Sequence, residues 1–399
     1  MRHQNSVFHQ VLKFVPWDVF DGLVEKHGSD LALRKHRTKD HLIAMLYGQL
    51  SGARSLREIE LGLKSQEGAF YHLGGCTVAR SSLAELNAST RSEQVFVGLL
   101  AALMRQLESG YRRKIADCVR LIDSTSVRLS SVSQDWAKFS AGVCGAKAHI
   151  VYDPDADQPL YLLVTAANVN DITAAKAMPI EPKATYVFDL GYYDFGWWAT
   201  LHDKGCRFVT RLKANTPFEI EFSRPVDPGS SILSDRIGYL PKRLAASRKN
   251  PMSAPVRELQ VVIDTGKVLR IVTNDLQASA QEIADLYKRR WAIELFFRWV
   301  KQTLRINHFL GCSETAVRIQ IVVALIAFLL LRLAQEATKL VASPLAFARL
   351  IRMNLMHRRS MLDLISGPGE PDTGQLHLEL LRRPEQASKR LRPPMKEAA

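Results

Sequence analysis

The sequence predicts an α/β core that carries a β-rich insertion and follows an all-α N-terminal region. Residues 6–110 show helical periodicity with few alternating strand patterns. Strands and helices alternate from Cys118 onward, and the helical pattern disappears between about residues 214 and 275. With 47% hydrophobic and 24% charged residues, the 399-residue chain has a globular composition, which excludes disordered and fibrous classes.

Capping signals and a glycine break organise the N-terminal helical region. The spacings Ser55 to Glu58 and Ser82 to Glu85 are typical of capping boxes, and each predicts the start of a helix. Between them, residues 73–75 (Leu-Gly-Gly) predict a turn. Two helices joined by such a turn would allow a DNA-binding helix-turn-helix. The open alternative is a helical bundle that packs or dimerises without contacting DNA.

The α/β elements follow in chain order. We predict an apolar strand from Cys118 that ends at Asp123, two strands around a polar turn over 147–167, a helix over 171–178, a strand ending at Asp189, a helix near 194–204, a strand over 207–213, and a strand-turn-strand within the insertion. The turn sequence Asp153-Pro-Asp-Ala-Asp157 begins like a calcium loop but lacks the glycine and glutamate that an EF-hand requires.

Helical periodicity returns at Ser279 and continues to Leu340. We predict one continuous helix from Leu286 to Ile306. The apolar run over 321–331 is too short to cross a bilayer, which takes about 20 residues, so we expect a buried core helix. The basic, proline-containing tail from Pro384 is expected to be loose.

Charge and cysteine content indicate the compartment and the class of partner. Lys plus Arg number 54 against 40 for Asp plus Glu, a net charge of +14 that favours nucleic acid over a membrane. The five cysteines are scattered, with no C-x-x-C pair typical of a zinc site or a redox pair. The first residues lack the pattern of a secretory signal. We therefore expect a cytoplasmic protein that does not associate with membranes.

Asp123 and Asp189 each follow an apolar strand segment. The ends of neighbouring strands gather at one edge of an α/β sheet, where sites often lie. Two carboxylates at that edge would form part of a site. The alternative is that each aspartate only caps a turn after its strand.

The predicted helix over 286–306 carries a third carboxylate among cations. At about 100° per residue, one arc of roughly 80° collects the polar side chains of the helix. They are Tyr287, Arg290, Glu294, Arg298, Lys301 and Arg305. A solvated helix face normally balances its charges more evenly, which favours a functional face. The alternative is that Glu294 merely pairs with Arg290 and Arg298 one turn away.

Asp123, Asp189 and Glu294 together make a set of hard oxygen ligands suited to magnesium or manganese. Two such ions about 4 Å apart would activate a water or a 3′-hydroxyl and stabilise the leaving oxygen in a phosphodiester displacement. The neighbouring cations would hold the strand being cut and offset charge in the transition state.

The spacing Tyr287-x2-Arg290-x3-Glu294-x6-Lys301 resembles the Y-(2)-R-(3)-E-(6)-K signature of insertion-sequence DDE transposases. The resemblance covers about residues 118–340 and implies a ribonuclease-H-like catalytic domain with a β-rich insertion between the second Asp and the Glu. It implies Asp123, Asp189 and Glu294 as catalytic metal ligands for two Mg²⁺ or Mn²⁺ ions. It also implies DNA contacts from Tyr287, Arg290 and Lys301. Arg298 lies on the same charged helix face, and we expect it to contact DNA as well.

The resemblance implies cut-and-paste transposition on double-stranded DNA, with a homodimer in the DNA complex. We predict a helical N-terminal domain over 1–112 with a possible role in recognising DNA ends, a catalytic domain over 113–340 with its insertion at about 214–275, and a C-terminal helical segment and basic tail over 341–399. The alternatives are a ribonuclease-H-like nuclease without strand transfer, and an inactive copy that only binds DNA ends.

Overall fold

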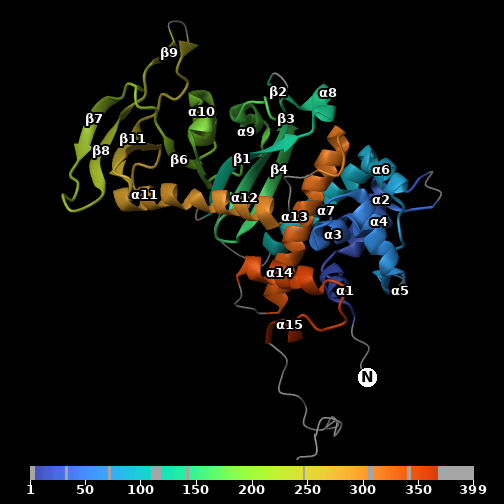
Figure 1. The fold of residues 1–399 in the computed structure, drawn as a ribbon. Coiled ribbons are helices and arrows are strands. Elements are labelled where there is room, and N and C mark those ends of the chain that lie inside the picture. The colour runs from blue at the N-terminus through green and yellow to red at the C-terminus, as the bar shows by residue number, and fades with distance from the viewer. Residues whose placement is uncertain are drawn as a thin grey trace, which may run out of the picture.

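One mixed β-sheet forms the centre of the α/β part of the protein (Figure 1). The computed structural model describes residues 5–31, 35–70, 73–108, 118–140, 143–245, 248–303, 309–338 and 343–366. Its strands are β1 (Val119–Leu129), β2 (Lys138–Ser140), β3 (Val143–Asp153), β4 (Gln158–Ala166), β5 (Thr185–Phe188), β6 (Arg207–Arg211), β7 (Glu219–Arg224), β8 (Ile232–Tyr239), β9 (Arg243–Ala245), β10 (Arg248–Lys249), β11 (Val256–Val262) and β12 (Val268–Thr273).

The strand order identifies the core. The order is β2-β3-β1-β5-β6-β12-β11-β8-β7, β4 also pairs with β3, and β9 and β10 form a separate hairpin. Strands β1, β5 and β6 run parallel, whereas β3 is antiparallel to β1 and to β4. This is a ribonuclease-H-like arrangement, and strands β12, β11, β8 and β7 extend the sheet beyond β6. The predicted α/β class with its β-rich insertion is confirmed.

Helices surround this sheet and form the whole described N-terminal region. They are α1 (Val7–Leu12), α2 (Trp17–His27), α3 (Thr38–Ser51), α4 (Leu56–Ser65), α5 (Glu67–Phe70), α6 (Arg80–Asn87), α7 (Thr90–Glu108), α8 (Gln134–Ala137), α9 (Asp171–Ala177), α10 (Phe195–Asp203), α11 (Ala280–Arg289), α12 (Trp291–Thr303), α13 (Glu314–Ala337), α14 (Pro344–Asn354) and α15 (Asp363–Ser366). The predicted basic tail and Arg305 lie outside the described residues.

The two faces of the sheet pack against different helices. Side chains alternate along a strand, so neighbouring residues of β1 face opposite sides. Leu121 belongs to the core cluster that includes α12 and α13, whereas Ile122 belongs to the cluster around α10. The second cluster is rich in aromatic side chains, among them Phe188 and Trp198. This alternation decides which helices a β1 side chain can reach.

Helix α13 joins the N-terminal helices to the α/β part. It contacts α3 and α7 of the helical region as well as α12 and α14 (Figure 1). Its length and hydropathy would fit a membrane span, but 83% of its most apolar window is buried inside the protein. The prediction of a buried core helix over 321–331 is therefore confirmed.

One prediction about the N-terminal region is wrong. Helix α6 begins at Arg80 after Ala79, which makes no side-chain cap, so Ser82 lies inside the helix. Ser55 does cap α4, accepting a hydrogen bond from the Glu58 amide at 3.1 Å. The Gly74 turn does not join α4 directly to α6, because α5 and further residues lie between them.

A buried histidine in α3 makes the fold sensitive to acid. His41 is fully buried, its Nε2 lies 2.8 Å from Asn87 Oδ1, and burial lowers its pKa to about 4. Unfolding restores the ordinary pKa, so the unfolded chain binds more protons and stability is lost as the pH falls from about 6.5 to 4. In the wild-type protein this histidine should lower the free energy of unfolding by up to about 3 kcal/mol over that pH range. We expect the His41→Gln variant to lack this decrease. Melting temperatures measured from pH 7.5 to 4.5 check this, and equal acid sensitivity of both proteins would contradict it.

Candidate active site

Asp123 and Asp189 lie side by side because of strand register. Leu121 pairs with Val187 across the parallel strands β1 and β5, and both belong to the core cluster on the α12 side of the sheet. Two residues further along the chain, Asp123 in β1 and Asp189, directly after the end of β5, follow on that same side. Asp123 lies in the middle of β1, not at its end as predicted, because pairing with β3 continues the strand to Leu129.

The third carboxylate comes from α12, which contacts β1. The prediction of one continuous helix over this segment is wrong, since α11 ends at Arg289 and α12 begins at Trp291. At the junction, the Arg290 amide donates to the Tyr287 carbonyl and the Ile293 amide donates to the Arg290 carbonyl. These short-range hydrogen bonds tighten the turn. The two helices still follow each other nearly end to end (Figure 1).

Arg290 lies between two of the carboxylates. Its Nη2 donates to Glu294 Oε1 at 2.5 Å, and its Nη1 lies 3.6 Å from Asp123 Oδ2. All three side chains are at most 30% exposed. The pair between Glu294 and Arg290 is the one that the alternative expects, and the same guanidinium also reaches Asp123, which lies on β1.

The electrostatics of Asp123 indicate a crowded carboxylate site. Burial, together with the nearby charges of Asp189 and Glu294, raises its pKa to about 7, against the opposing effects of the Ser124 amide and Arg290. The Ser124 amide donates to Asp123 Oδ1 at 2.8 Å. Like charges held together at this cost are typical of a site that binds cations.

A fourth carboxylate, Asp171 at the start of α9, was missed by the sequence analysis. Its Oδ1 accepts from Ser124 Oγ at 2.8 Å and from Lys147 Nζ at 3.2 Å, and lies 3.6 Å from His149 Nδ1. Asp171 thus ties β3 and α9 to the residue after Asp123. In the sequence, Asn170 and Asp171 indicate only the start of a helix, because Asn and Asp are common at helix N-termini.

Gly191 permits the close approach of these acidic side chains. Its amide donates to Asp189 Oδ1 at 2.8 Å. A Cβ atom at this position would lie 3.0 Å from Asp189 Oδ1 and 3.2 Å from Asp171 Oδ2. A larger residue would therefore press on both carboxylates.

The other predicted site residues differ in burial and in whether they lie near the carboxylates. Tyr287 is buried and lies close enough to Asp189 and Arg290 for their charges to affect its pKa, which burial raises. Lys301 is half-buried beside Asp123, and burial lowers its pKa. Arg298 is exposed, with its guanidinium 6.0 Å from the ring centre of Trp291. Tyr287, Arg290 and Lys301 therefore border the acidic cluster, whereas Arg298 points to solvent.

Arg211, at the end of β6, is a second residue that the sequence analysis missed. Its Nε is buried and has no hydrogen-bond partner among the described residues. Its positive charge opposes the rise in the pKa of Tyr287 that burial causes. The strand position alone gave no signal, because an arginine at a strand end is common.

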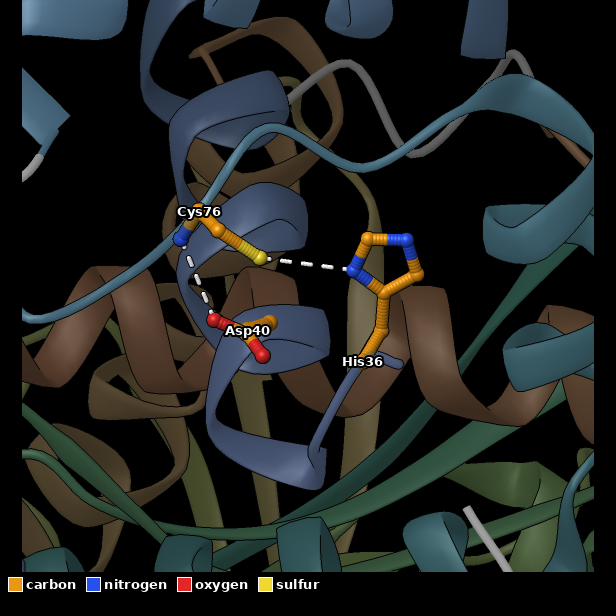
Figure 2. A group of neighbouring side chains, drawn as sticks. All are labelled: His36, Asp40 and Cys76. Atoms are coloured by element: carbon orange, nitrogen blue, oxygen red, sulfur yellow. Dashed lines mark hydrogen bonds between the residues drawn. The ribbon is translucent and has the colours of Figure 1, made fainter. Parts of the chain in front are cut away.

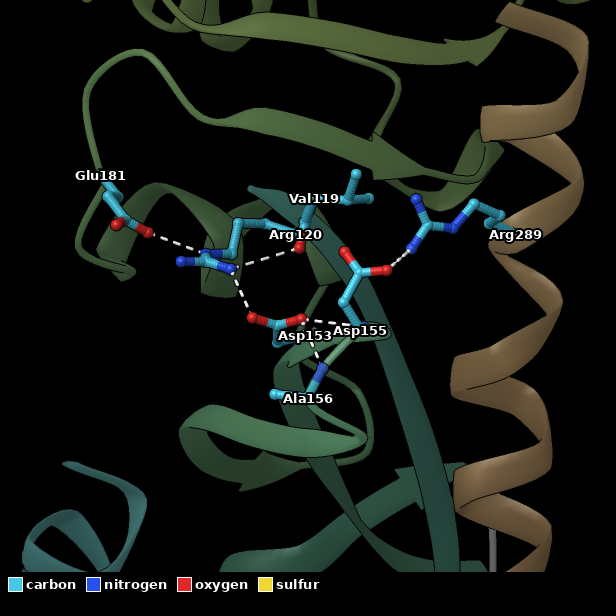
Figure 3. A network of polar contacts seen from close by, with 7 residues as sticks. All are labelled: Val119, Arg120, Asp153, Asp155, Ala156, Glu181 and Arg289. Atoms are coloured by element: carbon cyan, nitrogen blue, oxygen red, sulfur yellow. Dashed lines mark hydrogen bonds and ion pairs between the residues drawn. The ribbon is translucent and has the colours of Figure 1, made fainter. Parts of the chain in front are cut away.

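The β3–β4 turn anchors the end of α11 (Figure 3). Asp153 accepts hydrogen bonds from the amides of Asp155 and Ala156, as expected for a polar hairpin turn. Asp155 pairs with Arg289, the residue before Arg290. Asp153 also pairs with the buried Arg120 at 2.9 Å. The turn over residues 153–157, which begins like a calcium loop, therefore helps to position the helix junction.

A cavity of about 420 Å³ lies between the insertion strands and α11. Its lining combines apolar side chains of β11 and β12 with residues of the helix junction, among them Tyr287, Arg290 and Trp291. Trp291 is 50% exposed, so it is not a core contact. Arg290 therefore lines this cavity and also contacts Asp123 and Glu294.

Comparison with known proteins agrees with this geometry. Residues 114–330 match the family model described as the transposase DDE domain, which is more than half of the chain. This chain belongs to the DDE transposase family. Residues 3–76 of the transposase match a second model, described as a domain of unknown function (DUF4372).

Named relatives support the same assignment. The transposase is 38% identical over 283 residues to a Sinorhizobium fredii (strain NBRC 101917 / NGR234) protein named transposase y4zB, covering 70% of this chain and 78% of that one. It is 30% identical over 245 residues to a Geobacillus stearothermophilus protein named as the transposase for insertion sequence element IS5377, covering 60% and 63%.

A solved structure, the piggyBac transposase synaptic complex with hairpin DNA, is a weaker match. It aligns with 93% of this chain and 84% of that chain at a TM-score of 0.48 and 10% identity, and we base no argument on it. The family and the relatives confirm the predicted DNA transposase function. The boundaries of the domains and the roles of individual residues remain predictions.

Proposed function

We propose that Asp123, Asp189 and Glu294 hold the divalent metal ions, Mg²⁺ or Mn²⁺, with which this transposase cuts and joins DNA. The donor set fits, since the carboxylates of Asp123 in β1, Asp189 directly after β5 and Glu294 in α12 lie near one another and supply hard oxygen ligands. A cationic group already lies between two of them, namely the Arg290 guanidinium. Two ions, when bound, would activate the attacking oxygen and stabilise the leaving oxygen.

The cations beside these carboxylates position DNA. Arg290 and Lys301 both lie within reach of Asp123, so they would contact the phosphates next to the bond that breaks. Their charge offsets the negative charge that builds on the phosphorus oxygens in the transition state. The guanidinium carbon of Arg290 lies over the ring of Tyr287, 5.9 Å from its centre, so the ring supports the arginine. Arg298, which faces solvent, would contact the DNA backbone farther away.

The reaction consists of successive phosphoryl transfers. A water oxygen first attacks phosphorus at the transposon end, the P–O3′ bond breaks, and a 3′-hydroxyl and a 5′-phosphate result. That 3′-hydroxyl then attacks phosphorus in the opposite strand or in target DNA, and the displaced 3′-oxygen takes up a proton. Each step exchanges one P–O bond for another, so ATP is not required.

A joining assay distinguishes transfer from simple hydrolysis. The protein is incubated with a labelled transposon end, unlabelled plasmid and manganese. Label attached covalently to the plasmid supports strand transfer, and the Asp189→Asn variant serves as the inactive control. Only shortened labelled strands would indicate a nuclease, and intact bound strands would indicate an end-binding protein.

The cavity beside α11 offers a place for an unpaired base. Its apolar lining and the exposed ring of Trp291 suit stacking of a nucleobase, which is worth about 1–3 kcal/mol per base. Such a base would become available if the two strands of the transposon end were joined as a hairpin. This role rests on the proposed chemistry.

The N-terminal helices are the second candidate DNA contact. Exposed cations lie at the start of α3 and at the start of α6, namely Lys35, Arg37 and Arg80. We expect the triple alanine variant to bind transposon ends and unrelated DNA almost equally, because contacts that depend on the end sequence are lost. Competition binding measures this selectivity, with Lys26→Ala on α2 as the matched control. Unchanged selectivity in the triple variant would assign recognition to the catalytic domain.

Deletion of the N-terminal region is not a suitable test. Helices α3 and α7 share one hydrophobic cluster with α13, so removing them would expose the apolar surface of a core helix. Loss of DNA binding could then follow from misfolding alone.

Assembly and compartment follow from the reaction. We propose a homodimer in the DNA complex, since the two ends of one element require two active sites. A cytoplasmic location agrees with the free thiols of all five cysteines, none of which forms a disulfide in the described residues. The mass of the complex with end DNA, measured by light scattering, checks the dimer.

A further inference from the structure

Three possible metal ligands converge in the N-terminal helical region, far along the chain from the catalytic carboxylates (Figure 2). They are His36, just before α3, Asp40 in the first turn of α3, and Cys76, in the segment between α5 and α6. One ligand atom from each side chain lies within 4.8 Å of the other two. Figure 2 shows the imidazole and the thiol directed toward each other, with the carboxylate alongside.

The contacts within this cluster leave coordination capacity free. His36 Nδ1 lies 3.3 Å from Cys76 Sγ. Asp40 Oδ1 accepts the Cys76 amide at 3.1 Å, and its Oδ2 accepts the Arg37 amide at 2.8 Å. Each carboxylate oxygen therefore has one of its two lone pairs engaged by these bonds, and the other can reach a cation.

The donor chemistry selects the class of metal. Thiolate, imidazole and carboxylate are the ligands that Zn²⁺ takes in proteins, at about 2.0–2.3 Å each. Ligand atoms of a tetrahedral site are then separated by about 3.5 Å. The separation of 3.3 Å between His36 Nδ1 and Cys76 Sγ is close to this value. Magnesium, which prefers oxygen alone, would not select this set.

Capping of α3 does not account for the positions of all three side chains in this cluster. Capping of α3 needs only the Asp40 carboxylate, and it employs neither the thiol nor the imidazole. His36 is only 7% exposed, whereas its neighbours Lys35 and Arg37 are exposed. The His36 imidazole is turned inward, although its two neighbours are exposed cations, and it faces the thiol of Cys76, 40 residues further along the chain. A metal ion bound by both side chains would explain this arrangement.

We propose that His36, Asp40 and Cys76 form a zinc site, with water as the fourth ligand. The ion would bind the start of α3 to the segment before α6. It would thereby hold the exposed cations at these two helix starts in one arrangement. The site is separate from the catalytic carboxylates, and the proposal does not depend on their role.

Cobalt substitution of the full-length protein tests the proposal, because Co²⁺ reports its own ligands. A thiolate-to-cobalt charge-transfer band requires a cysteine ligand, which the catalytic carboxylates do not supply. We expect this band, with the visible absorption of tetrahedral cobalt, when Co²⁺ is added to the reduced metal-free protein. Added Zn²⁺ should remove both features by displacing the cobalt, while excess Mg²⁺ should leave them unchanged.

Variants identify the ligands. Cys76→Ser should abolish the charge-transfer band, and His36→Gln should weaken cobalt binding at least tenfold. Cys312→Ser, which removes the other exposed cysteine, should leave the spectrum unchanged. Absence of the band in the folded wild-type protein would overturn the proposal, as would its persistence in Cys76→Ser. Because the wild-type spectrum alone can refute the site, the outcome does not depend on whether the variants fold.

Discussion

Asp123→Asn, Asp189→Asn and Glu294→Gln are each expected to lower the rate of strand cleavage on the order of a thousandfold or more. Each change removes a charged oxygen ligand while keeping nearly the same shape. Binding of end DNA should stay within a few-fold of wild type, since the carboxylates repel phosphates and contribute no attraction. Single-turnover cleavage and equilibrium binding on the same DNA measure the two effects.

A matched control for these variants is Glu221→Gln, which neutralises an exposed carboxylate on the edge strand β7. It should cleave at the wild-type rate. Near wild-type cleavage by any one of the three site variants at saturating magnesium would show that its residue is not a metal ligand.

Arg290→Ala and Lys301→Ala are expected to have the next largest effect. Both should bind end DNA more weakly, and each lost phosphate contact should lower the slope of log K against log salt by about 0.9. Both should also cleave more slowly at saturating DNA, because positioning is lost together with charge. Tyr287→Phe should be milder, since the buried ring is retained.

The structure makes Arg290 the more informative of the two cations. Because it contacts Glu294 and Asp123, its removal could also act through the carboxylates alone. In that case the salt slope would stay unchanged and raised manganese would restore cleavage. Lys183→Ala, at the opposite end of β5 from Asp189, is the control and should leave the slope as in wild type.

Periodicity in the sequence was sufficient to predict the α/β class, the β-rich insertion and the buried helix α13. The spacing of Tyr287, Arg290, Glu294 and Lys301 also predicted a common face. This spacing could not predict the junction between α11 and α12 at Arg290, because apolar residues recur at the same helical interval before and after the junction. Where a regular pattern persists, a tightened turn leaves no sequence signal.

Contacts between distant segments were beyond sequence reasoning. Asp171 approaches Ser124 through the packing of α9 on the sheet, and Arg289 reaches Asp155 from another element. The cluster of His36, Asp40 and Cys76 has no recognisable spacing, since its cysteine lies 40 residues from the histidine. Only the folded chain brings such groups together.

Manganese binding to the complex with end DNA tests the central claim most directly. The loss of the free Mn²⁺ electron paramagnetic resonance signal gives the number of bound ions and their affinity. We predict two catalytic ions per active site in the wild-type protein, and at least tenfold weaker binding in Asp123→Asn, Asp189→Asn and Glu294→Gln. The same binding curve for wild type and all three variants would contradict the assignment of these carboxylates as the metal ligands.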